Sequence, residues 1–214
     1  MYQTIFFDLD GTLTDPGIGI TNSVAYALEK FGISVSDRTE LYKFIGPPLK
    51  ESFAKYYSMN EEDCEKAVFE YRVYFKNGGM FENKVYDGVK ELLEKLRNSG
   101  KTLVLATSKP EEFAIQILKH FGLFDYFDYV CGASMDGKIS EKADVVRYAL
   151  ETSGNPDKKT AIMVGDRFHD IFGAKQNGLS SIGVTYGYGS FDELKNAGAD
   201  FIVNDVNELL NVLL

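Results

Sequence analysis

The sequence is poor in cysteine and has no apolar run long enough to cross a membrane. Its 214 residues include only two cysteines, Cys64 and Cys131, which lie far apart, so a disulfide framework or a CxxC metal site has no support. The longest apolar runs, such as Thr102 to Ala106 and Ala161 to Val164, are far shorter than the roughly 18 residues that a membrane-spanning helix needs. We therefore expect no segment that spans a membrane.

Clusters of positive charge are missing as well. The formal net charge is −9, and no basic tract stands out, so binding to nucleic acid through phosphate neutralisation is not expected. The N-terminus lacks a basic segment and a small-residue cleavage site, which predicts a cytoplasmic location. If the substrate is an anion, a metal ion or particular lysines must reverse the sign of the charge at the site.

Apolar runs rich in β-branched residues indicate strands that are buried on both faces. They lie at Thr4–Asp8, Thr102–Thr107, Tyr129–Ala133, Ala161–Asp166, Ser181–Thr185 and Phe201–Val203. Between them, apolar residues recur with helical spacing, as at Val89, Leu92, Leu93 and Leu96. Because strands and helices alternate, we expect an α/β fold with a parallel sheet. Four glycines that follow helical stretches are expected to be left-handed caps, namely Gly100, Gly122, Gly154 and Gly178.

One long segment, from about Gly17 to Asn83, breaks this alternation. It has no convincing strand, and its periodic apolar residues predict only helices. We therefore predict an all-helical insert at residues 17–83, placed after the first strand of a core made of residues 1–16 and 84–214. Pro16 and Gly17 mark one junction, and Gly78 and Gly79 mark the other. Paired junctions of this kind suit a hinged lid.

The strongest local signal is the run Asp8-Leu9-Asp10-Gly11-Thr12, which stands where an apolar strand ends. In parallel α/β sheets ligands bind at that end of the strands. Asp8 is ionised at pH 7 and could attack phosphorus directly, provided that a cation offsets the repulsion between the two anions. Taken alone, the run is better explained by aspartates that bond to the amides of a turn.

Three further positions carry polar residues that suit phosphate chemistry. Asp166 and Asp170 follow an apolar strand and could either cap a helix or hold a hard cation such as Mg²⁺. Thr107 and Ser108 end another strand and can donate to phosphate oxygens at the start of the next helix. Lys142 lies near a helix start, where its charge opposes the helix dipole, although an exposed, solvated lysine would also explain it.

The four motifs in this order resemble those of the haloacid dehalogenase superfamily, and within it the phosphoglycolate phosphatase-like branch that carries a helical cap after the first strand. The resemblance covers essentially the whole chain and implies a Rossmann-like three-layer core. It also implies that Asp8 is the nucleophile that forms an aspartyl phosphate, and that Asp10 protonates the leaving group and later activates water.

The resemblance further implies a cofactor and its ligands. Mg²⁺ would be held by Asp8, the backbone carbonyl of Asp10, Asp166 and Asp170. Thr107, Ser108 and Lys142 would bind the phosphoryl oxygens. Dehalogenating members of the superfamily lack the second aspartate because halide leaves without a proton, so the presence of Asp10 argues against dehalogenation.

The expected function is therefore that of a Mg²⁺-dependent phosphatase acting on a small phosphate ester, either 2-phosphoglycolate or a nucleoside 5′-monophosphate. Substrate choice is expected to come from the insert, where Lys50 could meet a substrate anion or simply be solvated. The run Tyr186-Gly187-Tyr188-Gly189 resembles a loop common in phosphoglycolate phosphatases and in similar bacterial nucleotidases, although its tyrosines could also serve only in packing. A phosphomutase of the same fold and a non-catalytic phosphate-binding regulatory domain are the alternatives, and the oligomeric state stays open.

Overall fold

The computed structural model describes residues 1–214 and divides into two compact units. One unit consists of Met1–Asp15 and Val85–Leu214, and the other consists of Pro16–Lys84. Two short strands that the sequence did not predict, β2 Thr14–Asp15 and β3 Lys84–Val85, pair where the chain leaves and re-enters the first unit. The second unit is thus inserted into the first at a single place in the chain.

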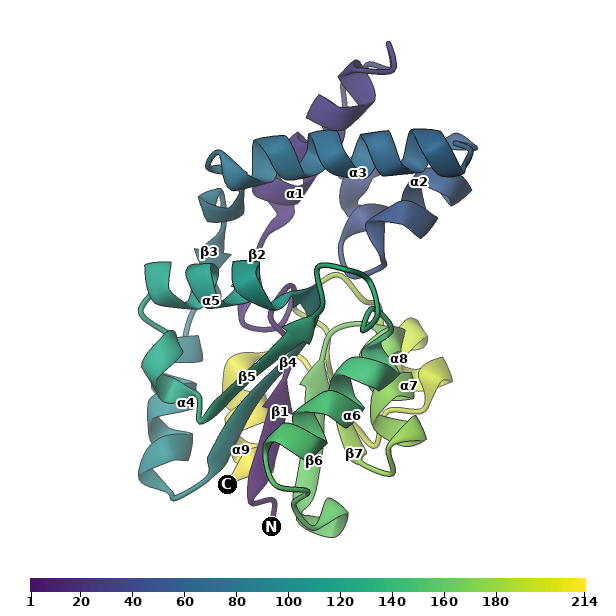
Figure 1. Cartoon of the computed structure of the whole chain (residues 1–214). Coiled ribbons are helices and arrows are strands. Elements are labelled where there is room, and N and C mark those ends of the chain that lie inside the picture. The colour runs from purple at the N-terminus through teal and green to yellow at the C-terminus, as the bar shows by residue number, and fades with distance from the viewer. The chain divides into compact units, whose positions relative to one another are not determined.

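The first unit is built on a six-stranded parallel sheet (Figure 1). Its strands are β1 Thr4–Phe7, β4 Thr102–Pro110, β5 Tyr129–Ala133, β6 Ala161–Gly165, β7 Ser180–Val184 and β8 Phe201–Val203. They lie in the order β5-β4-β1-β6-β7-β8, and all adjacent pairs are parallel. The direction of strand addition reverses at β1. Ligands of such sheets bind beyond the carboxyl ends of the strands at this reversal.

Helices cover both faces of this sheet, which confirms the predicted α/β fold. They are α4 Val89–Asn98, α5 Glu111–His120, α6 Lys142–Thr152, α7 Phe168–Gln176, α8 Phe191–Ala197 and α9 Val206–Leu213. Buried residues of α6 and α7 pack with β1, β4, β5 and β6 on one face, and α4 and α9 lie together on the other (Figure 1). The four glycines expected as left-handed caps have φ values of 66° to 82°.

Strand β4 is longer than predicted, and this changes where α5 begins. The sequence pattern placed the strand end at Thr107, but β4 continues to Pro110 and α5 starts at Glu111. A proline disfavours helical backbone in the residue before it, which keeps Lys109 extended. The expectation that Thr107 and Ser108 stand at the start of a helix is therefore wrong, although both lie near the carboxyl end of the strand.

The second unit consists of helices joined by turns. Its α-helices are α1 Gly17–Glu29, α2 Leu49–Tyr57 and α3 Glu61–Lys76, and 3₁₀ turns lie at Arg38–Phe44 and Gly79–Phe81. Aromatic contacts hold it together: the rings of Phe44 and Phe53 lie 5.0 Å apart, and Tyr71 stacks on Phe75.

None of the helices in the protein is both long enough and apolar enough to cross a membrane.

Candidate active site

Three buried aspartates converge at the carboxyl ends of the two central strands. Asp8 follows β1, Asp166 follows β6, and Asp170 lies in the first turn of α7. One oxygen from each carboxylate lies within 4.8 Å of the others. Gly165 makes this approach possible, because a Cβ atom at that position would lie 2.1 Å from Asp170 Cγ. Carboxylates this close repel one another when they are ionised, so a bound cation would stabilise the cluster.

Asp166 has one carboxylate oxygen that the protein satisfies and one that it does not. Oδ2 accepts a 2.8 Å hydrogen bond from the amide of Tyr188, whereas Oδ1 is buried and has no hydrogen-bond partner. Burial raises the pKa of Asp166 well above its usual range, and the nearby charges of Asp170 and Asp8 raise it further. A buried, unpartnered carboxylate oxygen beside two other carboxylates fits the all-oxygen ligand set that Mg²⁺ prefers.

Lys142 supplies positive charge to the same cluster. Its Nζ donates to Asp8 Oδ1 at 2.6 Å and to the carbonyl of Ala106 at 2.9 Å, and it forms an ion pair with Asp170 Oδ1 at 2.7 Å. Burial alone would lower the pKa of Lys142, but the charges of Asp170 and Asp8 outweigh it, and the pKa lies above its ordinary value. The lysine is therefore a buried, charged part of the site, which excludes the interpretation as a solvated surface residue.

Asp10 lies beside a second buried lysine. Lys109 Nζ is 2.8 Å from Asp10 Oδ2, and the two side chains are 6% and 11% exposed. Burial raises the pKa of Asp10, while the charge of Lys109 lowers it, and the net shift is upward. Lys109 was not among the site residues predicted from the sequence. The available signal was its place directly after Thr107 and Ser108 at a strand end.

The remaining predicted site residues fall in different places. Thr107 is buried, and its Oγ1 accepts a hydrogen bond from the amide of Lys109 at 3.2 Å. Ser108 is half-buried next to it on β4. Lys50 belongs to the helical unit, where its Nζ pairs with Glu61 at 3.0 Å and Glu65 at 3.2 Å. The first unit thus contains every predicted site residue except Lys50.

The loop Tyr186–Gly189 packs against both aspartate motifs. The hydroxyl of Tyr186 donates to the carbonyl of Thr12 at 3.0 Å, and the hydroxyl of Tyr188 bonds to Asp15. A Cβ atom on Gly187 would lie 2.2 Å from the carbonyl oxygen of Gly11 and 2.5 Å from Asp166 Cβ. Only glycine fits so tight a contact. The tyrosines therefore do more than fill space, because they hold the loop beside Asp166.

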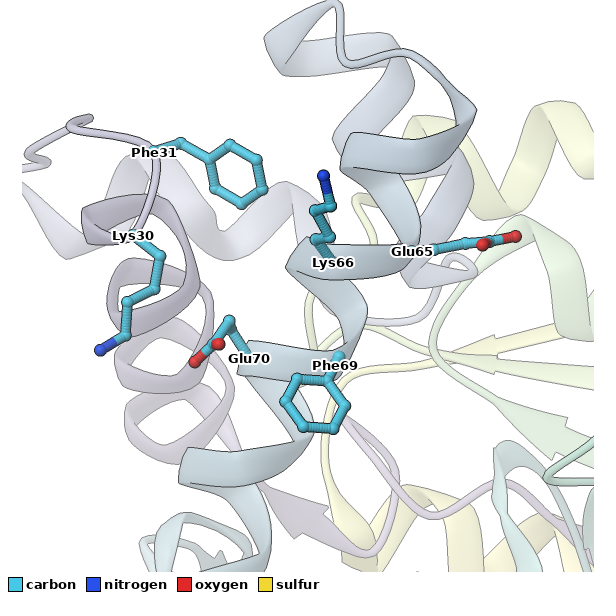
Figure 2. A pocket seen from close by; sticks show the side chains of 6 residues that line it. All are labelled: Lys30, Phe31, Glu65, Lys66, Phe69 and Glu70. Carbon is cyan, nitrogen blue, oxygen red and sulfur yellow. The ribbon is translucent and has the colours of Figure 1, made fainter.

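A separate hollow lies on the helical unit but offers no comparable chemistry. It has a volume of about 380 Å³ and lies between the end of α1 and one side of α3 (Figure 2). Its walls are formed by Lys30, Phe31, Glu65, Lys66, Phe69 and Glu70. Two aromatic rings and charges of both signs do not form a cluster of converging catalytic groups, so the aspartate cluster is the candidate active site.

Comparison with known proteins identifies the family. Residues 5–184 match the model of the haloacid dehalogenase-like hydrolases. The chain belongs to this family. It is 44% identical to a 5′-nucleotidase of Pseudomonas aeruginosa over 99% of this chain and 96% of that protein. It is 36% identical to the tyrosine-protein kinase PtkA of Mycobacterium tuberculosis over 98% of this chain and 73% of that protein.

A solved structure of the family is similar over the whole chain. The crystal structure of a predicted phosphatase from Clostridium acetobutylicum is 56% identical, covers 100% of this chain and 98% of its own, and superposes with a TM-score of 0.96. The predicted superfamily and the predicted enzyme class, a phosphatase, are both confirmed.

Proposed function

We propose that the protein is a Mg²⁺-dependent phosphomonoester hydrolase that works through an aspartyl phosphate on Asp8. The observation that carries this proposal is the arrangement around Asp8, which is one of three clustered buried carboxylates and accepts a hydrogen bond from the ammonium group of Lys142. A carboxylate in this position is held in one orientation and is shielded from the negative charge of an incoming phosphate.

Asp8 and Asp10 divide the chemistry between them. An oxygen of Asp8 forms a bond to phosphorus while the bond from phosphorus to the ester oxygen breaks, and the departing alkoxide takes a proton from Asp10. Water then attacks the aspartyl phosphate, Asp10 accepts a proton from that water, and inorganic phosphate leaves with Asp8 regenerated. Asp10 Oδ1 is buried and has no hydrogen-bond partner, which makes it the oxygen that would exchange the proton. A positioned acid of this kind is typically worth about 10² to 10⁴ in rate.

The metal would be held by Asp8, the backbone carbonyl of Asp10, Asp166 and Asp170. When bound, Mg²⁺ supplies positive charge that draws the phosphate oxygens to the site and offsets their repulsion from the carboxylates. The buried Oδ1 of Asp166, which no protein group satisfies, supports this assignment. A chain with a net charge of −9 repels an anionic substrate over long distances. One divalent ion together with Lys142 would supply the local positive charge that attracts the substrate phosphate.

Thr107, Ser108 and Lys142 would contact the phosphoryl oxygens that do not react. Lys142 donates to the carbonyl of Ala106, the residue before Thr107, so the lysine and the threonine belong to the same end of β4. Hydroxyl, amide and ammonium donors aimed at one phosphate stabilise the charge that develops as the phosphoryl group transfers.

The unit Pro16–Lys84 would act as the cap that selects the ester. The 44% identical relative is named a 5′-nucleotidase, which favours nucleoside 5′-monophosphates as the first class to test and places 2-phosphoglycolate second. Lys50 would have to exchange its contacts with Glu61 and Glu65 for a substrate anion, and this exchange would cost little because the three side chains are largely exposed to water. A small acid such as phosphoglycolate would depend most on such a cation.

The test is a comparison of kcat/KM for nucleoside monophosphates, 2-phosphoglycolate and sugar phosphates, with p-nitrophenyl phosphate as the reference ester. We expect turnover with Mg²⁺, none with EDTA, and none in Asp8→Asn. Asp128→Asn is a matched control, because that aspartate pairs with Arg97 on the surface, outside the site. Unaltered turnover by Asp8→Asn would overturn the mechanism. Activity that requires a sugar bisphosphate and returns phosphate to a sugar would instead indicate a phosphomutase.

A further inference from the structure

Lys109 is the second buried lysine at the site, and it contacts a different carboxylate from Lys142. The Nζ of Lys142 contacts the carboxylates of Asp8 and Asp170, whereas the Nζ of Lys109 lies 2.8 Å from Asp10 Oδ2. Burying a charged lysine costs desolvation free energy, and a carboxylate partner offsets that cost only when the geometry of the ion pair is good. Each of the two carboxylates proposed to react is thus paired with a lysine of its own.

The local backbone aims Lys109 at Asp10. The pairing of β4 with β5 changes register between Thr107 and Pro110, so the strand is irregular where Lys109 stands. The amide of Lys109 donates to Thr107 Oγ1, and Pro110 keeps the backbone extended as it enters α5. Such irregularities re-aim a side chain at the rim of a sheet. The lysine is therefore oriented by the same short segment that carries the proposed phosphate-binding threonine.

The contact leaves the two oxygens of Asp10 in different situations. Oδ2 is occupied by Lys109, while Oδ1 is buried without a hydrogen-bond partner. A carboxyl group that could rotate freely would present either oxygen in many directions. The ion pair removes that freedom and leaves one oxygen available in one direction.

We propose that Lys109 is a positioning residue that orients Asp10, so that Asp10 Oδ1 points at the ester oxygen and later at the attacking water. The proposal rests on the proposed function, because it needs Asp10 to be the acid and base. Lys109 itself contacts no reacting atom in this account. Its loss should therefore matter only for steps in which Asp10 transfers a proton.

Two esters with different leaving groups separate this role from phosphate binding. The stabilised anion p-nitrophenolate leaves without a proton, whereas phenolate, with a conjugate acid of pKa about 10, gains from one. For Lys109→Met we expect kcat/KM for phenyl phosphate to fall about tenfold or more, since oriented acid catalysis is worth about 10² to 10⁴. For p-nitrophenyl phosphate, kcat/KM should fall less than about threefold, because only the acid step is lost.

Lys101→Met is the matched control, because Lys101 is also a buried lysine and stands immediately before β4, at its opposite end. Its Nζ donates to the carbonyl of Tyr2 at 2.6 Å, away from the carboxylates. This variant should lose thermal stability but keep the wild-type ratio of kcat/KM for the two esters. If Lys109→Met does not fold, Lys109→Gln retains a hydrogen-bond donor and replaces it in the assay.

A double-mutant comparison completes the test. In an Asp10→Asn background, Lys109→Met should cause no further change in kcat/KM for phenyl phosphate, because the group that it orients is already gone. An equal loss for both esters, a weaker inhibition by inorganic phosphate, or an independent loss in the Asp10→Asn background would each overturn the proposal and make Lys109 a phosphate ligand. Turnover of neither ester by the wild type with Mg²⁺ would instead refute the proposed function.

Discussion

Replacing Asp166 by asparagine should make the metal-free protein more stable while it abolishes activity. Asp166 is 1% exposed, and burial together with the charges of Asp170 and Asp8 raises its pKa well above the ordinary value. A carboxyl group with a raised pKa binds more protons in the folded state, so it favours folding at low pH. That contribution is lost as the pH rises through the folded-state pKa. At pH 8 the ionised group opposes folding.

The size of the effect follows from the buried oxygen Oδ1 of Asp166, which has no hydrogen-bond partner. A buried polar group without a partner costs about 1–3 kcal/mol, and more when it is charged, and a chain of this size gains about 2–4 °C in Tm per kcal/mol. We therefore expect Asp166→Asn to raise the Tm in EDTA at pH 8 by at least about 2–4 °C. The amide oxygen of asparagine can still accept the hydrogen bond from the amide of Tyr188, so the loop contact is kept. The gain should shrink at pH 5, where Asp166 of the wild type binds its proton more readily.

Magnesium should reverse the ranking of the two proteins. A ligand at 100 times its Kd stabilises the folded state by about 2.7 kcal/mol, which corresponds to about 5–11 °C in Tm for the wild type. Asp166→Asn lacks one proposed ligand and should lose most of this increase.

The assay is thermal unfolding followed by circular dichroism, in EDTA and in Mg²⁺, at pH 8 and pH 5. Asp200→Asn is the control, because Asp200 also accepts a 2.8 Å hydrogen bond from a backbone amide, that of Ser181, but lies outside the cluster. It should keep the full increase with Mg²⁺. A Tm for Asp166→Asn in EDTA below that of the wild type would refute the argument from repulsion, and a full increase with Mg²⁺ would refute the metal assignment.

Two further predictions concern the packing around the site and in the core. Gly187→Ala should lower kcat about tenfold or more and reduce the Tm increase with Mg²⁺, because the added Cβ would lie 2.2 Å from the carbonyl oxygen of Gly11 and must displace the loop beside Asp166. Gly137→Ala, whose Cβ meets nothing within 4 Å, should cost about 1–2 kcal/mol for its positive φ and leave kcat unchanged; equal effects of the two substitutions on kcat would contradict the role of the loop. The two thiols should resist a thiol reagent in the folded protein at pH 8, since both cysteines are buried and burial raises the pKa of Cys131 to about 11. Absorbance of the released reagent should then follow the rate of unfolding, and complete labelling within the mixing time would show that the packing around Cys64 and Cys131 is wrong.

Sequence patterns determined the fold class and the placement of Asp8 and Asp166 at the same edge of the sheet. Both aspartates follow apolar runs that are buried on both faces, and parallel strands bring their carboxyl ends to one edge of a sheet. The periodic leucines of α4 and the glycine caps were likewise visible in the sequence, because burial and left-handed backbone are local requirements. The order of the motifs then predicted the superfamily.

Only the tertiary structure decided which charged groups pair. Lys142 is 134 residues from Asp8 and looked like a surface residue, yet the packing of α6 against the sheet buries its ammonium group between Asp8 and Asp170. Lys109 reaches Asp10 because β4 runs three residues further than its apolar pattern, and Lys50 is held by two glutamates of α3. Periodicity reports which positions are apolar, whereas the partner of a long charged side chain depends on how elements distant in the chain pack together.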